Sequence, residues 1–387
     1  MTLRKPLIVV APDALKGSCT SAEAARALAA GARAATDGAF RVLELPLADG
    51  GEGTLDALVA ASNGRIELID TVDALGRPRQ GRLGFSEDGR LAIVEAAEAN
   101  GLPLVLDRPL RALDADSFGV GTLIRAALAE GAEELLICLG GSATSDGGAG
   151  MLRALGAKLL DDAGDPVPAG ARGLSRLAAI DLSEVAPEAA SVRWRFATDV
   201  TNPLTGDQGA AAVFGPQKGA SPADVALIDA GLDRLAAVLA ELSEVDRARV
   251  SASPGSGAAG GLAIGPLTLW GGRCEPGSDL VARATGLDAA LADAALVLTG
   301  EGRVDSQSLG GKVLSRVITG TPSGVPVIVI AGSVGLTAEE CRHAGVTAAF
   351  SIAPGAASLD ELQRRAPELL AETAAHACRL ATTGMRI

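Results

Sequence analysis

Short apolar runs alternate with helical patterns at both ends of the chain. Leu7–Ala11 is continuously apolar, as expected of a strand buried on both faces. Thr20 and Glu23 then form a capping box, and apolar residues recur at helical spacing through Ala32. Further strands are predicted at 41–45, 294–298, 327–330 and 348–352. This alternation predicts an α/β fold.

The pattern changes in the middle of the chain. Ile66–Asp70 and Arg82–Phe85 alternate between polar and apolar residues, and the turn 87–89 leads into Leu91–Val94 as in a hairpin. The α/β pattern returns after about residue 287. We therefore predict a Rossmann-like three-layer α/β/α domain from residues 1–65 plus 287–387. Residues 66–286 are predicted to form an inserted α/β domain with mixed and antiparallel strands.

Composition narrows the class of protein. Of the 387 residues 48% are hydrophobic, so a large core can form although Tyr is absent. The formal charge of −13 argues against a nucleic-acid partner, which needs a basic face. No run of about 18 apolar residues occurs, so we expect no membrane span. The five widely spaced cysteines disfavour a disulfide framework and favour a cytoplasmic protein.

Three glycine-rich loops that carry acids follow predicted strands. They are residues 48–54 (ADGGEGT), 140–148 (GGSATSDGG, the central glycine loop) and 299–305 (TGEGRVD). Glycine lets a backbone approach a ligand closely, and neighbouring carboxylates can hold Mg²⁺ or accept a proton. This combination suits phosphoryl transfer, in which positioning and electrostatics provide most of the catalysis.

The central glycine loop lies between a predicted strand and a predicted helix. Backbone N–H groups in that setting hold phosphate, and Ser142 and Thr144 add hydroxyl donors. Asp146 would repel phosphate unless it binds Mg²⁺ or caps the helix. A simple turn between strand and helix, with Asp146 as its cap, is the alternative interpretation.

Lys16 and Asp199 are the other candidates for chemistry. Lys16 lies on the loop after the first strand, where ligands bind in open α/β sheets; a solvated surface lysine is the alternative. Asp199 ends a predicted strand and is a candidate general base, whereas an Asx-turn is the structural alternative. Glu95 and Glu98 are either site carboxylates or the start of a helix.

Familiar nucleotide-binding motifs are missing or weak. No GxxxxGK[ST] sequence occurs, since Gly310-Gly311-Lys312 and Gln217-Lys218-Gly219 lack the spacing. A GxGxxG match at Gly255, Gly257 and Gly260 follows residues that do not resemble a strand, which disfavours dinucleotide binding. Only two histidines occur, so any acid–base chemistry falls mainly to carboxylates and lysines.

The motifs along the chain resemble the bacterial glycerate kinase family, the type with two α/β domains. The resemblance covers nearly the whole chain and rests on several long motifs in the same order. They are APD with KGS at 11–18, ADGGEGT at 48–54, GGSAT-x-DGG at 140–148, DVTNPLTG at 199–206, FGPQKGA at 214–220, GSGAAGG at 255–261, GEGRVDSQS at 300–308 and Gly311-Lys312. The chain departs from the usual family pattern at Ala14, Leu15, Ser145 and Val313.

This resemblance implies phosphorylation of D-glycerate by ATP with Mg²⁺ in a cleft between two domains, generally at the 2-hydroxyl. We expect 2-phosphoglycerate as the product and leave 3-phosphoglycerate open. The partner is then a small molecule, and the protein a monomer or homodimer. Kinases of related hydroxy or sugar acids and a non-catalytic glycerate- or nucleotide-binding regulator remain alternatives.

Roles for individual residues are hypotheses at this point. Catalysis is assigned to Asp199, Lys16 and Asp49, and the metal to Asp49 and Glu52. The nucleotide phosphates are assigned to Gly140, Gly141, Ser142, Thr144, Asp146 and Gly147. Glycerate is assigned to Asn202, Glu301, Arg303, Asp305, Gln307 and Lys312.

Overall fold

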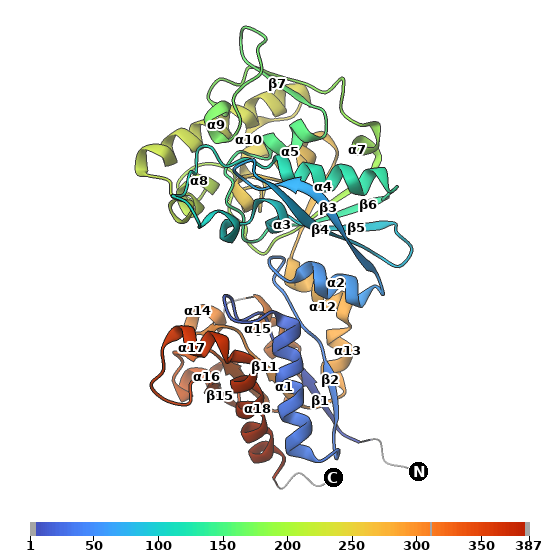
Figure 1. The fold of residues 1–387 in the computed structure, drawn as a ribbon, viewed down its shortest axis with the longest axis vertical. Coiled ribbons are helices and arrows are strands. Elements are labelled where there is room, and N and C mark those ends of the chain that lie inside the picture. The colour runs from blue at the N-terminus through green and yellow to red at the C-terminus, as the bar shows by residue number, and fades with distance from the viewer. Residues whose placement is uncertain (1–4, 310–311, 384–387) are drawn as a thin grey trace. The chain divides into compact units, whose positions relative to one another are not determined.

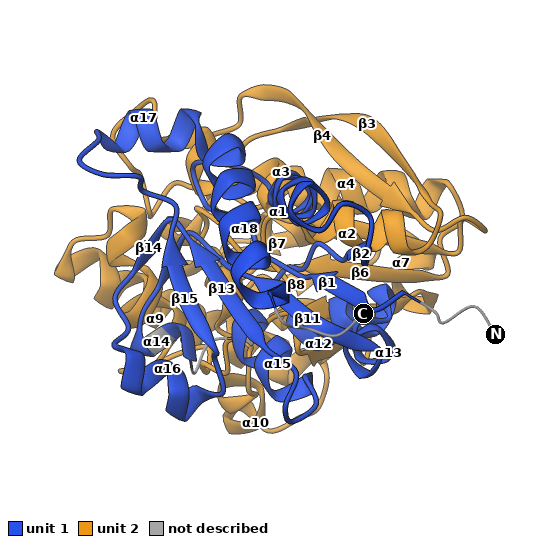
Figure 2. Ribbon diagram, turned by 90° about the horizontal axis from the view of Figure 1, so that it is seen from below, with its two compact units in different colours: residues 1–49, 278–387 blue, residues 50–277 orange. Residues whose placement is uncertain are grey.

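The computed structural model describes residues 5–309 and 312–383 and contains two compact units (Figures 1 and 2). Unit 1 is formed by residues 1–49 and 278–387, and unit 2 by residues 50–277. The sequence pattern had placed these boundaries at 65/66 and 286/287. Residues 50–65 fall in unit 2 because α2 (Thr54–Ala61) packs against strands of that unit.

Unit 1 is built on a parallel five-stranded sheet with the order β15-β13-β11-β1-β2. The strands are β1 (Leu7–Val10), β2 (Arg41–Glu44), β11 (Ala294–Thr299), β13 (Val327–Ala331) and β15 (Ala348–Ser351). Taken in chain order within the unit, this is the doubly wound arrangement 2-1-3-4-5. The apolar runs at the centre of the sheet, in β1, β11 and β13, are buried or nearly so, as predicted. The strand predicted as buried at 348–352 forms β15, which is only partly buried because it lies at an edge of the sheet, as does β2.

Helices cover both faces of this sheet. Ile328 and Ile330 face the cluster formed with α1 (Ser21–Thr36) and α18 (Ala366–Thr382), whereas Val329 and Ala331 face the cluster formed with α15 (Lys312–Gly320) and α16 (Ala338–Ala344). The alternation follows from the two-residue period of a strand. Figure 1 shows the blue α1 beside the red α18, so the two chain ends share one core. The predicted α/β/α domain from both ends is confirmed.

The smaller elements of unit 1 connect these layers. The Thr20–Glu23 capping box at the start of α1 is present as predicted. The remaining elements are α12 (Gly277–Thr285), α13 (Leu287–Ala292), β12 (Arg303–Val304), α14 (Ser306–Leu309), β14 (Ser333–Val334) and α17 (Leu359–Arg364).

Unit 2 contains a mixed six-stranded sheet with the order β10-β9-β6-β5-β4-β3. Its strands are β3 (Arg65–Val72), β4 (Pro78–Phe85), β5 (Leu91–Glu95), β6 (Glu134–Cys138), β9 (Arg193–Ala197) and β10 (Arg273–Glu275). The first three strands pair antiparallel, and β5, β6, β9 and β10 run parallel. The predicted hairpin and the mixed character of the sheet are both confirmed.

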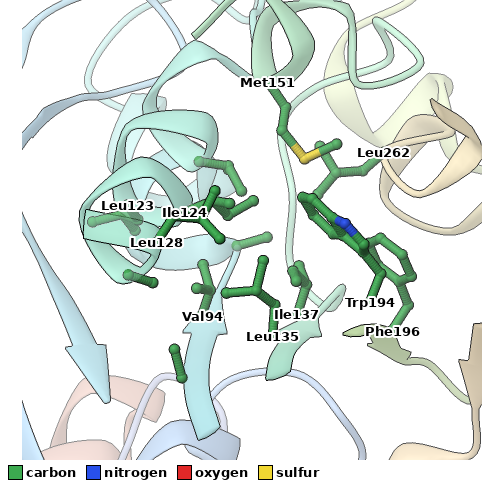
Figure 3. Close-up of a cluster of buried hydrophobic side chains, with 14 of the residues drawn as sticks. Val94, Leu123, Ile124, Leu128, Leu135, Ile137, Met151, Trp194, Phe196 and Leu262 are labelled. Atoms are coloured by element: carbon green, nitrogen blue, oxygen red, sulfur yellow. The ribbon is translucent and has the colours of Figure 1, made fainter. Parts of the chain in front are cut away.

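The main core of unit 2 lies between this sheet and α4 (Phe118–Ala129). Figure 3 shows Ile124 of α4 facing Val94 and Ile137 of the sheet, and Leu123 of the same helix belongs to this cluster as well. Trp194 lies in the same cluster, stacks on Trp270 with ring centroids 5.3 Å apart, and donates its indole N–H to a backbone carbonyl at 2.7 Å. Both tryptophans of the chain therefore report on this unit.

A second core forms around the long helix α9 (Pro222–Leu242), which begins at the predicted Ser221 cap. The other elements of unit 2 are α3 (Ala97–Asn100), η1 (Leu102–Val105), α5 (Ala149–Ala154), β7 (Lys158–Leu160), α6 (Ala171–Leu174), β8 (Ala179–Asp181), α7 (Pro187–Ser191), α8 (Ala210–Phe214), η2 (Pro216–Lys218), α10 (Arg247–Ala252), η3 (Ala258–Gly260) and α11 (Ile264–Leu269). None of the helices in residues 5–309 and 312–383 combines the length and apolar character needed to cross a membrane.

The two ends of unit 2 lie side by side. A Cβ atom placed on Gly50 would be 3.2 Å from the Cα atom of Gly277 and 3.2 Å from the backbone of Ala197. Gly50 also has a φ of 90°, which favours glycine. The chain thus enters and leaves unit 2 at one place.

Candidate active site

The central glycine loop follows β6 in unit 2, and other glycine motifs pack against it. Gly140 donates its N–H to the carbonyl of Gly50 at 3.3 Å, and Gly147 donates to Gly260 at 2.9 Å. A Cβ on Gly260 would lie 2.1 Å from the carbonyl oxygen of Thr144, so only glycine fits there. Parts of three glycine motifs, which are far apart in sequence, therefore meet at this loop.

The DVTNP segment extends the cluster. Gly257 donates its N–H to the carbonyl of Asn202 at 3.0 Å, and the Asn202 side chain donates to Gln208 at 2.8 Å. Asp199 is half-buried and follows β9, the neighbour of β6 in the sheet. Because these strands are parallel, their carboxyl ends lie at the same edge of the sheet. Asp199 and the central glycine loop therefore share that edge of unit 2.

Asp146 forms hydrogen bonds that shape the loop. Its carboxylate accepts from the backbone N–H and the hydroxyl of Ser117, at 2.9 and 2.7 Å, and from the N–H groups of Gly148 and Gly150. Complete burial raises the pKa of Asp146, and the charge of Asp116 raises it further. Asp146 thus binds N–H groups at the start of α5, as in the capping alternative, but the N-cap position itself is occupied by Gly148.

Lys218 is a functional candidate to which the sequence analysis assigned no role. Its side chain is buried, and Nζ donates to the carbonyl oxygen of Thr144 at 2.5 Å and to the Ser142 hydroxyl at 3.3 Å. Burial lowers its pKa to about 8, against the opposing effect of the Asp146 charge. In the sequence, Lys218 stood out only in the FGPQKGA motif and in the Gln217-Lys218-Gly219 segment that lacks the GxxxxGK[ST] spacing, and neither reveals that the side chain is buried.

Glu95 and Glu98 both have partners within unit 2. Glu95 is buried and accepts the N–H groups of Gly53 and Leu55, at 3.2 and 3.3 Å, at the start of α2. Burial raises the pKa of Glu95 to about 8. Glu98 forms an ion pair with Arg82 at 2.7 Å. Glu95 therefore supports the backbone of the glycine-rich loop 48–54 and the start of α2.

In unit 1 the candidate residues lie at the carboxyl ends of three adjacent strands. Asp13 and Lys16 follow β1, Asp49 follows β2, and Glu301 follows β11. The loops are joined by hydrogen bonds from Asp13 N–H to Gly300 at 2.8 Å and from Leu47 N–H to Pro12 at 2.9 Å. In a 2-1-3-4-5 sheet, β1 and β11 flank the switch point where ligands of doubly wound proteins bind.

Charges in this cluster perturb one another. Burial raises the pKa of Asp13 to about 7, and the charge of Asp49 raises it further, whereas Lys16 lowers it. Burial also raises the pKa of Glu301, one of whose carboxylate oxygens is buried without a hydrogen-bond partner. Perturbed carboxylates at a ligand-binding edge are typical of functional sites. Asp13 was missed as a candidate, although its place at the end of the first strand could have indicated it.

The remaining candidates of unit 1 lie after β11. Arg303 is exposed and pairs with Asp305 at 3.1 Å. Gln307 lies in α14 and Lys312 in α15, but their side chains lie outside what the structure describes, as do Gly310 and Gly311. Asp49 belongs to unit 1, whereas the exposed Glu52 belongs to unit 2.

Local geometry also bears on two other kinds of site, a dinucleotide-binding loop and a cluster of metal-ligating side chains. The GxGxxG match at Gly255 follows helix α10, whereas a dinucleotide site requires a preceding strand. In the described part of the chain, no group of three or more His, Cys, Asp or Glu side chains is arranged to hold a metal ion. All five cysteines are free.

Comparison with known proteins identifies the family. A sequence profile of the Glycerate kinase family matches residues 8–382. A glycerate kinase from Bacillus subtilis is 43% identical over 369 residues, with 95% of each chain covered. A glycerate 2-kinase from Escherichia coli is 39% identical over 388 residues, with 98% of this chain and 99% of the relative covered.

A solved structure agrees with these relatives. The crystal structure of a candidate glycerate kinase 2 from Salmonella typhimurium LT2 superimposes with a TM-score of 0.84 at 41% identity, and the match covers 99% of this chain and 100% of that one. The similarity extends over both units and is far above the level at which only the fold is shared. The chain therefore belongs to the glycerate kinase family.

Proposed function

We propose that this protein transfers the γ-phosphoryl group of ATP to D-glycerate and forms 2-phosphoglycerate. The observation that carries the proposal is the similarity, over at least 95% of the chain, to relatives named glycerate kinase or glycerate 2-kinase. The convergence of the family motifs on the central glycine loop supports it, since glycine-rich backbone suits phosphate binding.

The nucleotide phosphates are assigned to the central glycine loop and to Lys16. Gly140, Gly141 and Gly147 allow close approach of the backbone, and Ser142 and Thr144 carry hydroxyl groups. Asp146 contributes by holding the loop rather than by touching phosphate, because its oxygens already accept four hydrogen bonds. Lys16 is exposed at the edge of the unit 1 sheet and supplies a positive charge.

Asp199 is assigned as the group that accepts the proton of the glycerate hydroxyl. Arg303 and Lys312 are assigned to the glycerate carboxylate, and Asn202, Glu301, Asp305 and Gln307 to its hydroxyls. A guanidinium group can bind a carboxylate through two parallel hydrogen bonds, which fixes its orientation. The pair that Arg303 forms with Asp305 would have to rearrange for that contact.

Mg²⁺ fits this scheme through Asp49 and Glu52. Mg²⁺ that arrives with ATP keeps several waters and commonly uses only one or two protein carboxylates, so a cluster of three is not required. When bound, the ion neutralises charge on the phosphates. The cytoplasmic location and the monomeric or dimeric state remain predictions from the sequence.

The deciding experiment incubates the purified protein with D-glycerate, ATP and Mg²⁺ and identifies the product by phosphorus NMR. We expect a 2-phosphoglycerate signal that disappears when EDTA removes the metal. A 3-phosphoglycerate signal would retain the kinase but reverse the orientation of the substrate. If no product forms, a panel including tartronate and longer sugar acids separates a related kinase from a non-catalytic binding protein.

A further inference from the structure

We propose that Lys218 is the positioning residue of the central glycine loop, whose ammonium group holds Ser142 and Thr144 in the conformation that binds the ATP phosphates. This inference rests on the proposed kinase function. It assigns a role to a lysine whose sequence neighbourhood lacks the spacing of a GxxxxGK[ST] motif.

The backbone around Lys218 is fixed by local structure. Lys218 ends the short helix η2, and its N–H donates to Gly215 at 2.9 Å. The next residue, Gly219, has a φ of 88°, and a Cβ there would lie 2.5 Å from the side chain of Leu110. The lysine side chain therefore leaves a rigid turn and reaches the loop from a defined point.

Thr144 is held from two sides. Its carbonyl oxygen accepts from Lys218 Nζ at 2.5 Å, and its hydroxyl accepts from the amide of Asn100 at 2.9 Å. The N–H of Ala143 donates to the carbonyl of Asn100 at 2.7 Å. The shape of the loop therefore depends on two buried polar side chains that come from different parts of unit 2.

A neutral side chain at position 218 would remove the hydrogen bonds that Nζ donates to Ser142 and Thr144. Only 3% of Lys218 is exposed, and a buried ammonium is strongly unfavourable unless its N–H groups are used. The N–H groups of the Lys218 ammonium donate to two oxygens of the central glycine loop. The positive charge also lies beside a loop that is proposed to bind an anion, so it favours phosphate as well as loop shape.

Nearby acidic groups affect the protonation of the Lys218 ammonium. Asp146, on the loop itself, is the group whose charge acts on Lys218, and it raises the pKa of the lysine. Behind Asp146 lies Asp116, which pairs with Arg153 at 2.5 Å. Burial outweighs the effect of Asp146 and leaves the lysine with a pKa of about 8. ATP binding should therefore depend on pH in the range where Lys218 loses its proton.

The test measures the dissociation constant for ATP with Mg²⁺, and the KM for glycerate, in wild type, Lys218→Met, Lys218→Arg and the surface control Lys158→Met. Lys158 is exposed and pairs with Glu184. We expect Lys218→Met to weaken ATP binding by about 10- to 100-fold, as for loss of hydrogen bonds from a charged group. The KM for glycerate should change much less, and Lys158→Met should behave as wild type.

The pH profile supplies a readout that a merely structural role would not move. In wild type, the affinity for ATP should fall about tenfold per pH unit above pH 8, because the free protein then loses the proton that binding requires. Lys218→Arg stays protonated, so its affinity should remain constant to pH 10.

Several outcomes would overturn the proposal. One is a Lys218→Met protein that binds ATP as tightly as wild type. If that variant does not fold, wild type decides the question, and an ATP affinity that stays constant from pH 7 to 10 refutes the role. A wild type that binds ATP but phosphorylates no glycerate refutes the proposed function alone, since the ATP measurements still test Lys218.

Discussion

Glu95 offers a direct test of how burial controls the charge state of unit 2. The carboxyl group lies at the end of β5 and is 2% exposed. It accepts the N–H groups of Gly53 and Leu55, and burial raises its pKa from 4.5 to about 8. Replacement by glutamine keeps the shape and an acceptor oxygen but removes the ionisation.

The sign of the effect follows from proton binding. Between pH 4.5 and about 8 the folded protein keeps a proton that the unfolded chain has released. The free energy of unfolding therefore falls as pH rises, by about 1.4 kcal/mol per pH unit. From pH 4.5 to about 8, Glu95 should lower the free energy of unfolding by about 5 kcal/mol. The Glu95→Gln variant should not show this decrease.

Tryptophan fluorescence is the appropriate assay, because the only two tryptophans, Trp194 and Trp270, lie in unit 2. Urea unfolding would be followed at pH 5, 7 and 9 for wild type, Glu95→Gln and the exposed control Glu241→Gln. The difference between the Glu95 variant and wild type should be small at pH 5 and should approach about 5 kcal/mol in favour of the variant at pH 9.

The difference in the free energy of unfolding between wild type and Glu95→Gln reports on the ionisation of Glu95 alone. Other carboxylates contribute equally to wild type and variant, so they cancel in the difference. A difference that does not grow from pH 5 to pH 9, while the control matches wild type, would refute the conclusion that Glu95 is protonated in the folded protein at neutral pH.

Three further predictions concern the site. Asp199→Asn should lower kcat by about 100-fold or more with an unchanged urea midpoint; near-normal turnover would remove Asp199 as the base. Lys16→Ala should raise the dissociation constant for ATP more than the KM for glycerate, and an unchanged ATP affinity would remove Lys16 from the phosphate site. Gly260→Ala should destabilise unit 2 by about 1–3 kcal/mol more than Gly131→Ala and weaken ATP binding. Both glycines have positive φ, but a Cβ meets the Thr144 carbonyl only at Gly260; equal effects would contradict this reasoning.

Much of the fold could be predicted from local sequence patterns. Continuous apolar runs such as Leu7–Ala11 are typical of strands covered on both faces. The caps at Thr20 and Ser221 mark helix starts because their side chains bond to free N–H groups. These signals are local, so no tertiary information was needed. The boundary near residue 50 was harder, because the apolar face of α2 does not reveal which sheet it will cover.

The site was predictable only where glycine and charge occurred together in the sequence. The loops at 48–54 and 140–148 had that signal, and the structure brings Gly50 and Gly140 into contact. The sequence did not show that Lys218 and Glu95 are buried, since their burial results from segments far away in the chain. The altered pKa values of both residues follow from that packing and could not be predicted from residue type.

The adjacent ends of unit 2 at Gly50 and Gly277 have a consequence for how the whole chain folds. Unit 1 is interrupted by roughly 230 residues. If that insertion were unfolded, closing so long a loop would oppose the folding of unit 1 by about 5 kcal/mol. Once unit 2 has folded, its neighbouring ends act as a short connection between the two halves of unit 1. Folding of the insertion therefore stabilises its host through the chain alone, and unit 2 is expected to fold first.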